Sequence, residues 1–336
     1  MNYNSQPQQP IVPYYLTEEY QEKQSIKNSS NALGIGIVLS LVPSFFIISI
    51  LLLLARLFGG STNYNADFNG VAPAIYYVII SITSIISLVV PFWLSSIIMK
   101  RKISTLIQFN SFDKKFGVAC IGIGMTTCIC ANFFASYLIS NLNSIGIDPY
   151  VPNIPYDNNI ASIILYVVSV SIVPALVEEF SFRGVILGSL RKYGDGFAVI
   201  VSAALFGLFH ANFLQIPFAF VVGLILGFLT VRLNSILPAV IIHFINNFSS
   251  VISDIIEHNS SDFYSNLYTT IIFLFFILIG TLCLIYILKK DKSFFSISRS
   301  TSVLTLKEKF KAFAFSATMV VTLVLIALET LISSVN

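Results

Sequence analysis

Residues 160–189 have the sequence IASIILYVVSVSIVPALVEEFSFRGVILGS, an apolar run that contains three charged side chains, Glu178, Glu179 and Arg183. An apolar helix of about 20 residues crosses the hydrocarbon core of a bilayer. Ionisable groups at such a depth are costly and usually functional. The run therefore predicts a membrane helix, and its charges mark the first place to look for chemistry.

Similar runs recur along the 336-residue chain, which is 56% hydrophobic, only 10% charged and has a mean hydropathy of +0.84. Soluble domains carry about a quarter charged residues, so the composition indicates an integral membrane protein. We expect helices at 33–58, 71–99, 116–142, 160–189, 197–213, 215–231, 236–256, 267–288 and 312–333. The two helices around Pro217 are short for a span. The predicted fold class is therefore all-α, a polytopic transmembrane bundle of eight to nine helices with its site inside the membrane, because barrels show short alternating segments instead.

The positive charges predict the orientation. With a cytoplasmic N-terminus, all 19 Lys and Arg except Arg56 and Arg183 lie inside. We therefore expect a multi-pass protein, in a bacterial cell membrane, with its active-site cavity facing the cytoplasm. Residues 1–30 are expected to be a disordered polar tail, and 31–333 one membrane domain with a catalytic core at about 160–250.

The net charge and the cysteines indicate which partners and sites to expect. The net charge of +3 follows from the topology, and the basic segments lack interleaved aromatic side chains, so no nucleic-acid partner is expected. The four cysteines all lie within apolar runs and are expected to be small core residues. The partners predicted are the lipid bilayer and a membrane-associated substrate.

The charged cluster has two parts. Glu179 and Arg183 are four residues apart and share a helix face, so they can pair inside the membrane. Glu178 points about 100° away and is left without that partner. Pro174 removes a backbone hydrogen bond just before the cluster and predicts a kink.

Two later apolar runs also contain polar side chains that share a helix face with another residue of the same run. Phe206 lies one turn before His210, and His243 lies one turn before Asn247. If the fourth and fifth runs form a hairpin turning near Gly194, Glu178 and His210 reach the same depth. His243, nine residues past a turn at Asn234, is expected to be somewhat shallower.

These groups suit the hydrolysis of a carbonyl compound, most simply a peptide bond. A carboxylate in an apolar bundle can act as a general base on water, with a histidine nearby to hold that water. His243 and Asn247 offer N–H donors for an oxyanion. No cofactor is expected, although zinc stays open because His210, His243 and Glu178 would supply two histidines and one carboxylate. Neither a G-x-S-x-G nor an H-E-x-x-H motif is present.

The strings Glu178-Glu179-x-x-x-Arg183, Phe206-x-x-x-His210 and His243-x-x-x-Asn247 resemble, in this order, the three motifs of the CAAX protease and bacteriocin-processing (CPBP, or Abi) family of intramembrane endopeptidases. The resemblance covers about residues 160–250.

The resemblance implies a glutamic endopeptidase. Glu178 would activate water with the help of His210, His243 and Asn247 would bind the oxyanion, and Glu179 and Arg183 would be structural or tuning residues. Eukaryotic relatives cleave prenylated CAAX proteins, and bacterial relatives are associated with bacteriocin processing or self-immunity.

Two other classes of function stay open. A catalytically silent scaffold for bacteriocin immunity or partner binding would keep the cavity without turnover. A proton-coupled transporter could use the same acids, but transporters often contain inverted repeats, and the sequence shows no such symmetry.

Overall fold

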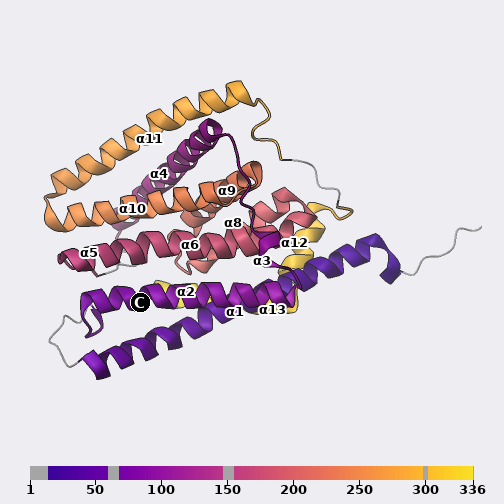
Figure 1. Cartoon of the computed structure of the whole chain (residues 1–336), viewed down its shortest axis with the longest axis horizontal. Helices are drawn as coiled ribbons and strands as arrows, with labels where there is room; N and C mark the ends of the chain where they lie inside the picture. The colour runs from indigo at the N-terminus through magenta and orange to yellow at the C-terminus, as the bar shows by residue number, and fades with distance from the viewer. Residues whose placement is uncertain (1–13, 60–67, 147–154, 298–301, 336) are drawn as a thin grey trace, which may run out of the picture.

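The structure is a computed structural model that describes residues 14–59, 68–146, 155–297 and 302–335 (Figure 1). Within these ranges the chain is helical, and the β-type contact is limited to an isolated bridge between Phe109 and Ser235. The helices outside the central one are α1 (Glu18–Gly59), α2 (Pro73–Ile98), α3 (Ile103–Leu106), α4 (Lys114–Ser144), α8 (Asp195–Phe209), α9 (Gln215–Leu233), α10 (Leu237–Asn259), α11 (Asp262–Lys290), α12 (Leu306–Ala314) and α13 (Ala317–Val335). The predicted all-α bundle is confirmed.

All nine apolar runs form helices, but the number of full spans is smaller. Seven of the described helices are long and apolar enough to cross a membrane, and α12 with α13, bent by 75°, would make an eighth. The remaining run forms α8, which has 15 residues. At 1.5 Å per residue α8 is about 22 Å long, short of the roughly 30 Å hydrocarbon core. The described residues therefore contain seven or eight candidate spans, which includes the lower predicted number of eight but not nine.

The N-terminal boundary also differs from the prediction. Helix α1 begins at Glu18, so the second half of the expected polar tail is helical. Two acids in its first turn favour this start through the helix dipole, and Ser25 and Ser29 both hydrogen-bond the Tyr193 hydroxyl. Residues 1–13 of the expected tail lie outside the described residues.

The central helix runs from residue 160 to 193 and is not uniform. Its parts are α5 (Ile160–Val167), the π-helix η3 (Val168–Ile172), α6 (Val173–Glu179), the π-helix η4 (Phe180–Leu187), α7 (Gly188–Leu190) and the short 3₁₀-helix η5 (Arg191–Tyr193). The π-helix η3 lies directly before Pro174, where the chain lacks a backbone donor. Gly194 follows with φ +120°, a conformation that favours glycine. The predicted hairpin turn at Gly194 is confirmed.

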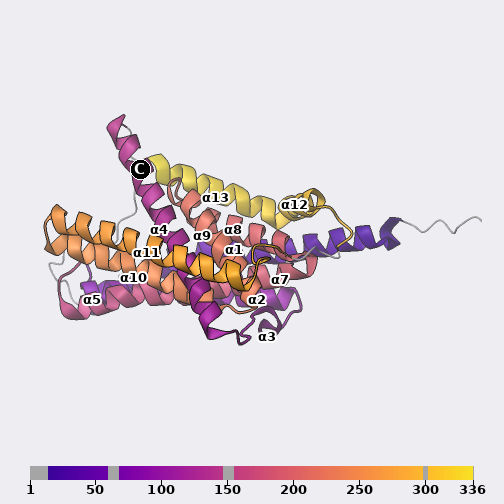
Figure 2. The same cartoon turned by 90° about the horizontal axis from the view of Figure 1, so that it is seen from above.

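The central helix occupies the middle of the bundle (Figure 1). It packs against α2 on one side and α10 on the other, α1 lies beyond α2, and α11 lies beyond α10. Helices α8 and α9 pack closely on each other and on η4. Seen from above, α12 and α13 lie along a further edge of the bundle (Figure 2). The charged residues of the central helix are thereby enclosed from several sides.

The α8–α9 contact depends on Gly223, where an added Cβ would lie 2.9 Å from the Ala203 Cα. We expect Gly223→Ala to lower the free energy of unfolding by about 1–3 kcal/mol, the usual cost of overpacking. Gly196→Ala is the matched control, since a Cβ there meets nothing within 4 Å, and helix propensity predicts up to about 1 kcal/mol of stabilisation. Unfolding in detergent micelles measures both. Equal effects of the two substitutions would contradict the close approach.

Candidate active site

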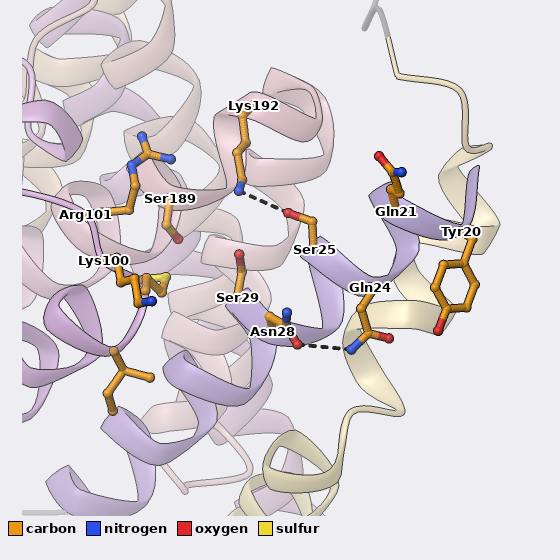
Figure 3. Close-up of a pocket in the computed structure, with 12 residues that line it drawn as sticks. Tyr20, Gln21, Gln24, Ser25, Asn28, Ser29, Lys100, Arg101, Ser189 and Lys192 are labelled. Atoms are coloured by element: carbon orange, nitrogen blue, oxygen red, sulfur yellow. Dashed lines mark hydrogen bonds between the residues drawn. The ribbon is translucent and has the colours of Figure 1, made fainter. Parts of the chain in front are cut away.

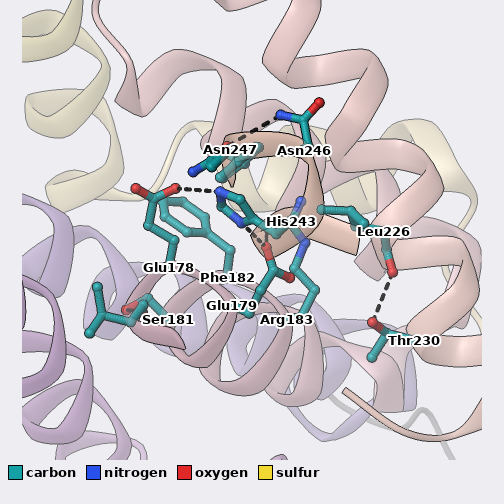
Figure 4. Close-up of polar contacts among 12 residues, drawn as sticks. Glu178, Glu179, Ser181, Phe182, Arg183, Leu226, Thr230, His243, Asn246 and Asn247 are labelled. Carbon is teal, nitrogen blue, oxygen red and sulfur yellow. Dashed lines mark hydrogen bonds and ion pairs between the residues drawn. The ribbon is translucent and has the colours of Figure 1, made fainter. Parts of the chain in front are cut away.

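The Glu179 carboxylate lies at the centre of the buried polar cluster (Figure 4). Its Oε1 accepts hydrogen bonds from Arg183 Nη1 at 2.9 Å and from His243 Nδ1 at 2.8 Å. The Glu179 and Arg183 side chains are completely buried. The pairing predicted from their spacing is confirmed, and the same carboxylate also orients the His243 imidazole.

The pair is not fully satisfied by the described residues. Glu179 Oε2 and the Nε and Nη2 atoms of Arg183 are buried and have no hydrogen-bond partner among them. The Arg183 guanidinium instead lies over the Phe206 ring, 4.2 Å from its centroid. Such a cation–π contact stabilises a desolvated cation by about 2 kcal/mol, so Phe206 helps to keep Arg183 inside the membrane.

Glu178 differs from its neighbour in exposure and in partners. Its side chain is 20% exposed, and its Oε2 lies 3.9 Å from His243 Nε2. That distance is too long for a direct hydrogen bond. A water or substrate oxygen beside both atoms could contact each of them. Glu178 is therefore the more accessible of the two acids and faces the imidazole that Glu179 holds.

The Phe206 ring connects the two histidines. It makes edge-to-face contacts with His210, at 5.0 Å between centroids, and with His243, at 6.0 Å. The predicted packing of Phe206 on His210 is confirmed. His210 Nδ1 lies 2.9 Å from the Phe206 carbonyl oxygen, and because a carbonyl can only accept, Nδ1 carries the proton. In the neutral imidazole Nε2 is then an acceptor.

The chain turns sharply after His210. Helix α8 ends at Phe209, earlier than the run to residue 213 predicts, and Ala211 has φ +46°. A non-glycine residue in this conformation is strained and persists only where its surroundings hold it. The Ala211 carbonyl accepts a hydrogen bond from Ser333 Oγ of α13 at 2.7 Å. Helix α13 thereby supports the backbone next to His210.

Asn247 is held by a backbone group that Pro174 leaves unpaired. Pro174 has no N–H to donate to the Val170 carbonyl four residues earlier, and Asn247 Nδ2 donates to that oxygen at 3.1 Å. Asn246 Nδ2 donates to Asn247 Oδ1 at 3.2 Å, and Asn132 Nδ2 donates to Asn246 Oδ1 at 2.9 Å. These bonds fix the Asn247 amide and leave its second N–H for another acceptor.

One expectation from the sequence needs revision here. His243 contacts both glutamates, so its imidazole lies level with their carboxylates and not at a shallower depth. Asn132 and Asn246 are additional residues of the site that the three motifs do not contain. Their signal was an amide side chain within an apolar run, where polar groups commonly hydrogen-bond between helices.

The donor set gives no metal site as it stands. Among the residues that the structure describes, no three His, Cys, Asp or Glu side chains form a group that could hold a metal ion. The combination of Glu178, His210 and His243 therefore does not fit zinc in this arrangement, and we derive no step through a metal.

Comparison with known proteins finds a similarity that covers the central helices. Residues 160–249 match the family model described as type II CAAX prenyl endopeptidase Rce1-like. This segment, from α5 through most of α10, is therefore similar to that family and contains the three motifs that resemble it. No curated protein and no solved structure gives a significant match to the chain. The chain is thus a multi-pass membrane protein with a segment that resembles CAAX-type intramembrane proteases.

The buried pair predicts a large and specific effect on stability. Arg183→Met leaves the Glu179 charge buried without its cation, which typically costs about 3–5 kcal/mol. Glu179→Gln in the same chain removes that charge, so the double variant should recover part of the loss. Denaturant unfolding in mixed micelles measures both variants.

Arg191 provides the matched control. It pairs with Asp195 at the same spacing, but the two side chains are 25% and 19% exposed. Arg191→Met also removes a hydrogen bond to Asn234 Oδ1, so it should cost about 1–2 kcal/mol, still less than Arg183→Met. A double variant as unstable as Arg183→Met alone, or an equal loss in Arg191→Met, would contradict the proposed coupling.

Proposed function

We propose that the protein is a glutamic-type intramembrane endopeptidase that hydrolyses a peptide bond of a membrane-associated substrate. The single observation that carries the proposal is that Glu178 is the accessible acid beside His243 Nε2, while the buried Glu179 holds the opposite nitrogen of that imidazole. The family match of this segment supports the same reaction class.

In the proposed reaction the Glu178 carboxylate takes a proton from water as the water oxygen attacks the scissile carbonyl carbon. The C–N bond then breaks, and the proton held by Glu178 passes to the departing amine. General base catalysis of this kind contributes about 10²–10⁴-fold. His210 assists by accepting a hydrogen bond from the water through Nε2, since its Nδ1 donates to the Phe206 carbonyl.

The developing oxyanion needs donors fixed in advance. We assign His243 Nε2–H and the second Nδ2–H of Asn247 to this role. His243 donates from both nitrogens only as an imidazolium. Two carboxylates and one guanidinium surround it, so a protonated His243 makes the Glu178, Glu179, Arg183 and His243 group electrically neutral. Neutrality lowers the cost of keeping these charges out of water.

The substrate class follows from the family match and from the membrane depth of the residues. We propose a peptide or protein anchored at the membrane, with a prenylated CAAX sequence or a bacteriocin-like peptide as the substrates to test. The alternative is a scaffold that retains the cavity for immunity or partner binding without turnover. Both alternatives keep Glu178 near His243, so only an activity measurement separates them.

Glu178→Gln tests the proposal because it preserves shape and removes the base. We expect purified wild-type protein to cleave a member of a panel of membrane-tethered peptides, farnesylated and unmodified, and Glu178→Gln to be about 10²–10⁴-fold slower. Glu257→Gln is the control, since Glu257 is an exposed acid on α10.

Two outcomes would count against this mechanism. Cleavage that persists in Glu178→Gln would exclude Glu178 as the base. Loss of wild-type cleavage in chelator, restored by zinc, would replace the metal-free mechanism by a metal-dependent one. A resistance phenotype that survives Glu178→Gln would favour the scaffold.

A substitution of Asn132 tests the role of Asn247 as oxyanion donor through the hydrogen bonds that connect the two residues. Asn132 lies at the start of the amide chain and hydrogen-bonds Asn246, which in turn hydrogen-bonds Asn247. Asn132→Leu frees Asn246 to rotate, and we expect kcat to fall about tenfold with KM unchanged, because small displacements of catalytic groups are costly. Asn141→Leu, at an exposed position of α4, should leave both constants unchanged. An equal change in kcat and KM would argue against positioning.

A further inference from the structure

A second polar cavity lies apart from the glutamate cluster and has a volume of about 560 Å³ (Figure 3). Its walls come from the first turns of α1, the end of α2 and the end of the central helix. Three cations line it, Lys100, Arg101 and Lys192, together with the hydroxyl groups of Ser25, Ser29 and Ser189. None of the residues assigned to catalysis belongs to this cavity.

The charges in the cavity are not balanced by acids. No Asp or Glu lines it, and none of the ion pairs formed by described residues includes its three cations. Glu18 and Glu22 line an adjoining depression that Lys192 shares, and the Glu22 carboxylate accepts hydrogen bonds from Ser302 Oγ and the Val303 backbone N–H. The cavity thus concentrates positive charge beside hydroxyl groups, which suits a phosphate.

The backbone conformation of Lys100 is a second observation that points to a function for this cavity. Lys100 has φ +54°, and the Lys100 and Arg101 N–H groups bond the carbonyls of Ile97 and Ser96, each at 2.9 Å. This is the Schellman ending of a helix, in which the position of Lys100 is usually glycine. A lysine here is strained and is not needed to end the helix, and such outliers tend to serve function.

The cavity also lies at the depth of lipid headgroups. The apolar run of α2 ends at Met99, immediately before the cations. Ile97 and Ile98, the last apolar residues of α2, are 51% and 50% exposed. Basic pockets between membrane helices at this level bind anionic headgroups. We propose that the cavity binds the phosphate of an anionic membrane lipid, with the acyl chains along Ile97 and Ile98.

Native mass spectrometry of the full chain in detergent tests this proposal. The probes are dioleoyl phosphatidylglycerol, dioleoyl phosphatidylcholine and inorganic phosphate. We expect phosphatidylglycerol to bind in preference to phosphatidylcholine, and millimolar inorganic phosphate not to displace it. The triple variant Lys100→Gln, Arg101→Gln, Lys192→Gln should bind phosphatidylglycerol at least about tenfold more weakly, since each basic residue near a membrane surface contributes to attraction.

The control variant removes three positive charges, as the first triple variant does, but from residues outside the cavity. Lys292, Lys307 and Lys311 are exposed residues outside the cavity, and their triple replacement by Gln should change the affinity less than about twofold. Equal losses in both triple variants, or no preference for phosphatidylglycerol, would overturn the proposal. Displacement by inorganic phosphate would overturn the lipid assignment in favour of a soluble phosphate compound.

Lys100→Gly keeps the test valid if the triple variant unfolds. Glycine relieves the strained backbone, so the melting temperature should rise or stay the same while the affinity for phosphatidylglycerol falls. Unchanged affinity in this variant would overturn the contribution of Lys100 to the cavity.

Discussion

The Glu179 carboxylate is the group on which the site depends, because it is fully buried and accepts hydrogen bonds from two different helices. Arg183 makes its burial tolerable, and His243 ties it to α10. A one-residue shift of either helix would keep the Glu179–Arg183 pair, which lies within one helix, but would break the His243–Glu179 hydrogen bond and leave a buried polar group unpaired, at a cost of about 1–3 kcal/mol. The same contact that orients the His243 imidazole therefore also favours one register of the central helix against α10.

A second constraint on the site arises because Pro174 has no backbone N–H to donate. Pro174 leaves the Val170 carbonyl without its usual helical partner, and that carbonyl becomes the fixed point to which Asn247 is bonded. Asn246 and Asn132 hold the amide from the other side. The irregular part of the central helix thus supplies a backbone acceptor that fixes a side chain of α10, in keeping with the frequent occurrence of π-helical turns at functional sites.

The sequence predicts the helices, the Glu179–Arg183 pair and the contact of Phe206 with His210 because these follow from local spacing and from the cost of charge in lipid. It does not predict that His243 reaches both glutamates, because the relative height of two turns depends on packing between helices. It also does not predict the π-helices η3 and η4, since a 3.6-residue period cannot indicate where one extra residue enters a turn. The beginning of α1 at Glu18 was missed for a similar reason, since its supports come from Tyr193, far along the chain.

The hydrogen bond from Ser333 to the strained Ala211 carbonyl has a consequence for biosynthesis. The segment that matches the family model ends at residue 249, yet the backbone beside His210 receives this support from the last described helix. A membrane protein is inserted as it is translated, so the glutamates, both histidines and Asn247 enter the bilayer well before α13 does. The hydrogen bond that supports the backbone beside His210 therefore cannot form until α13 has been synthesised.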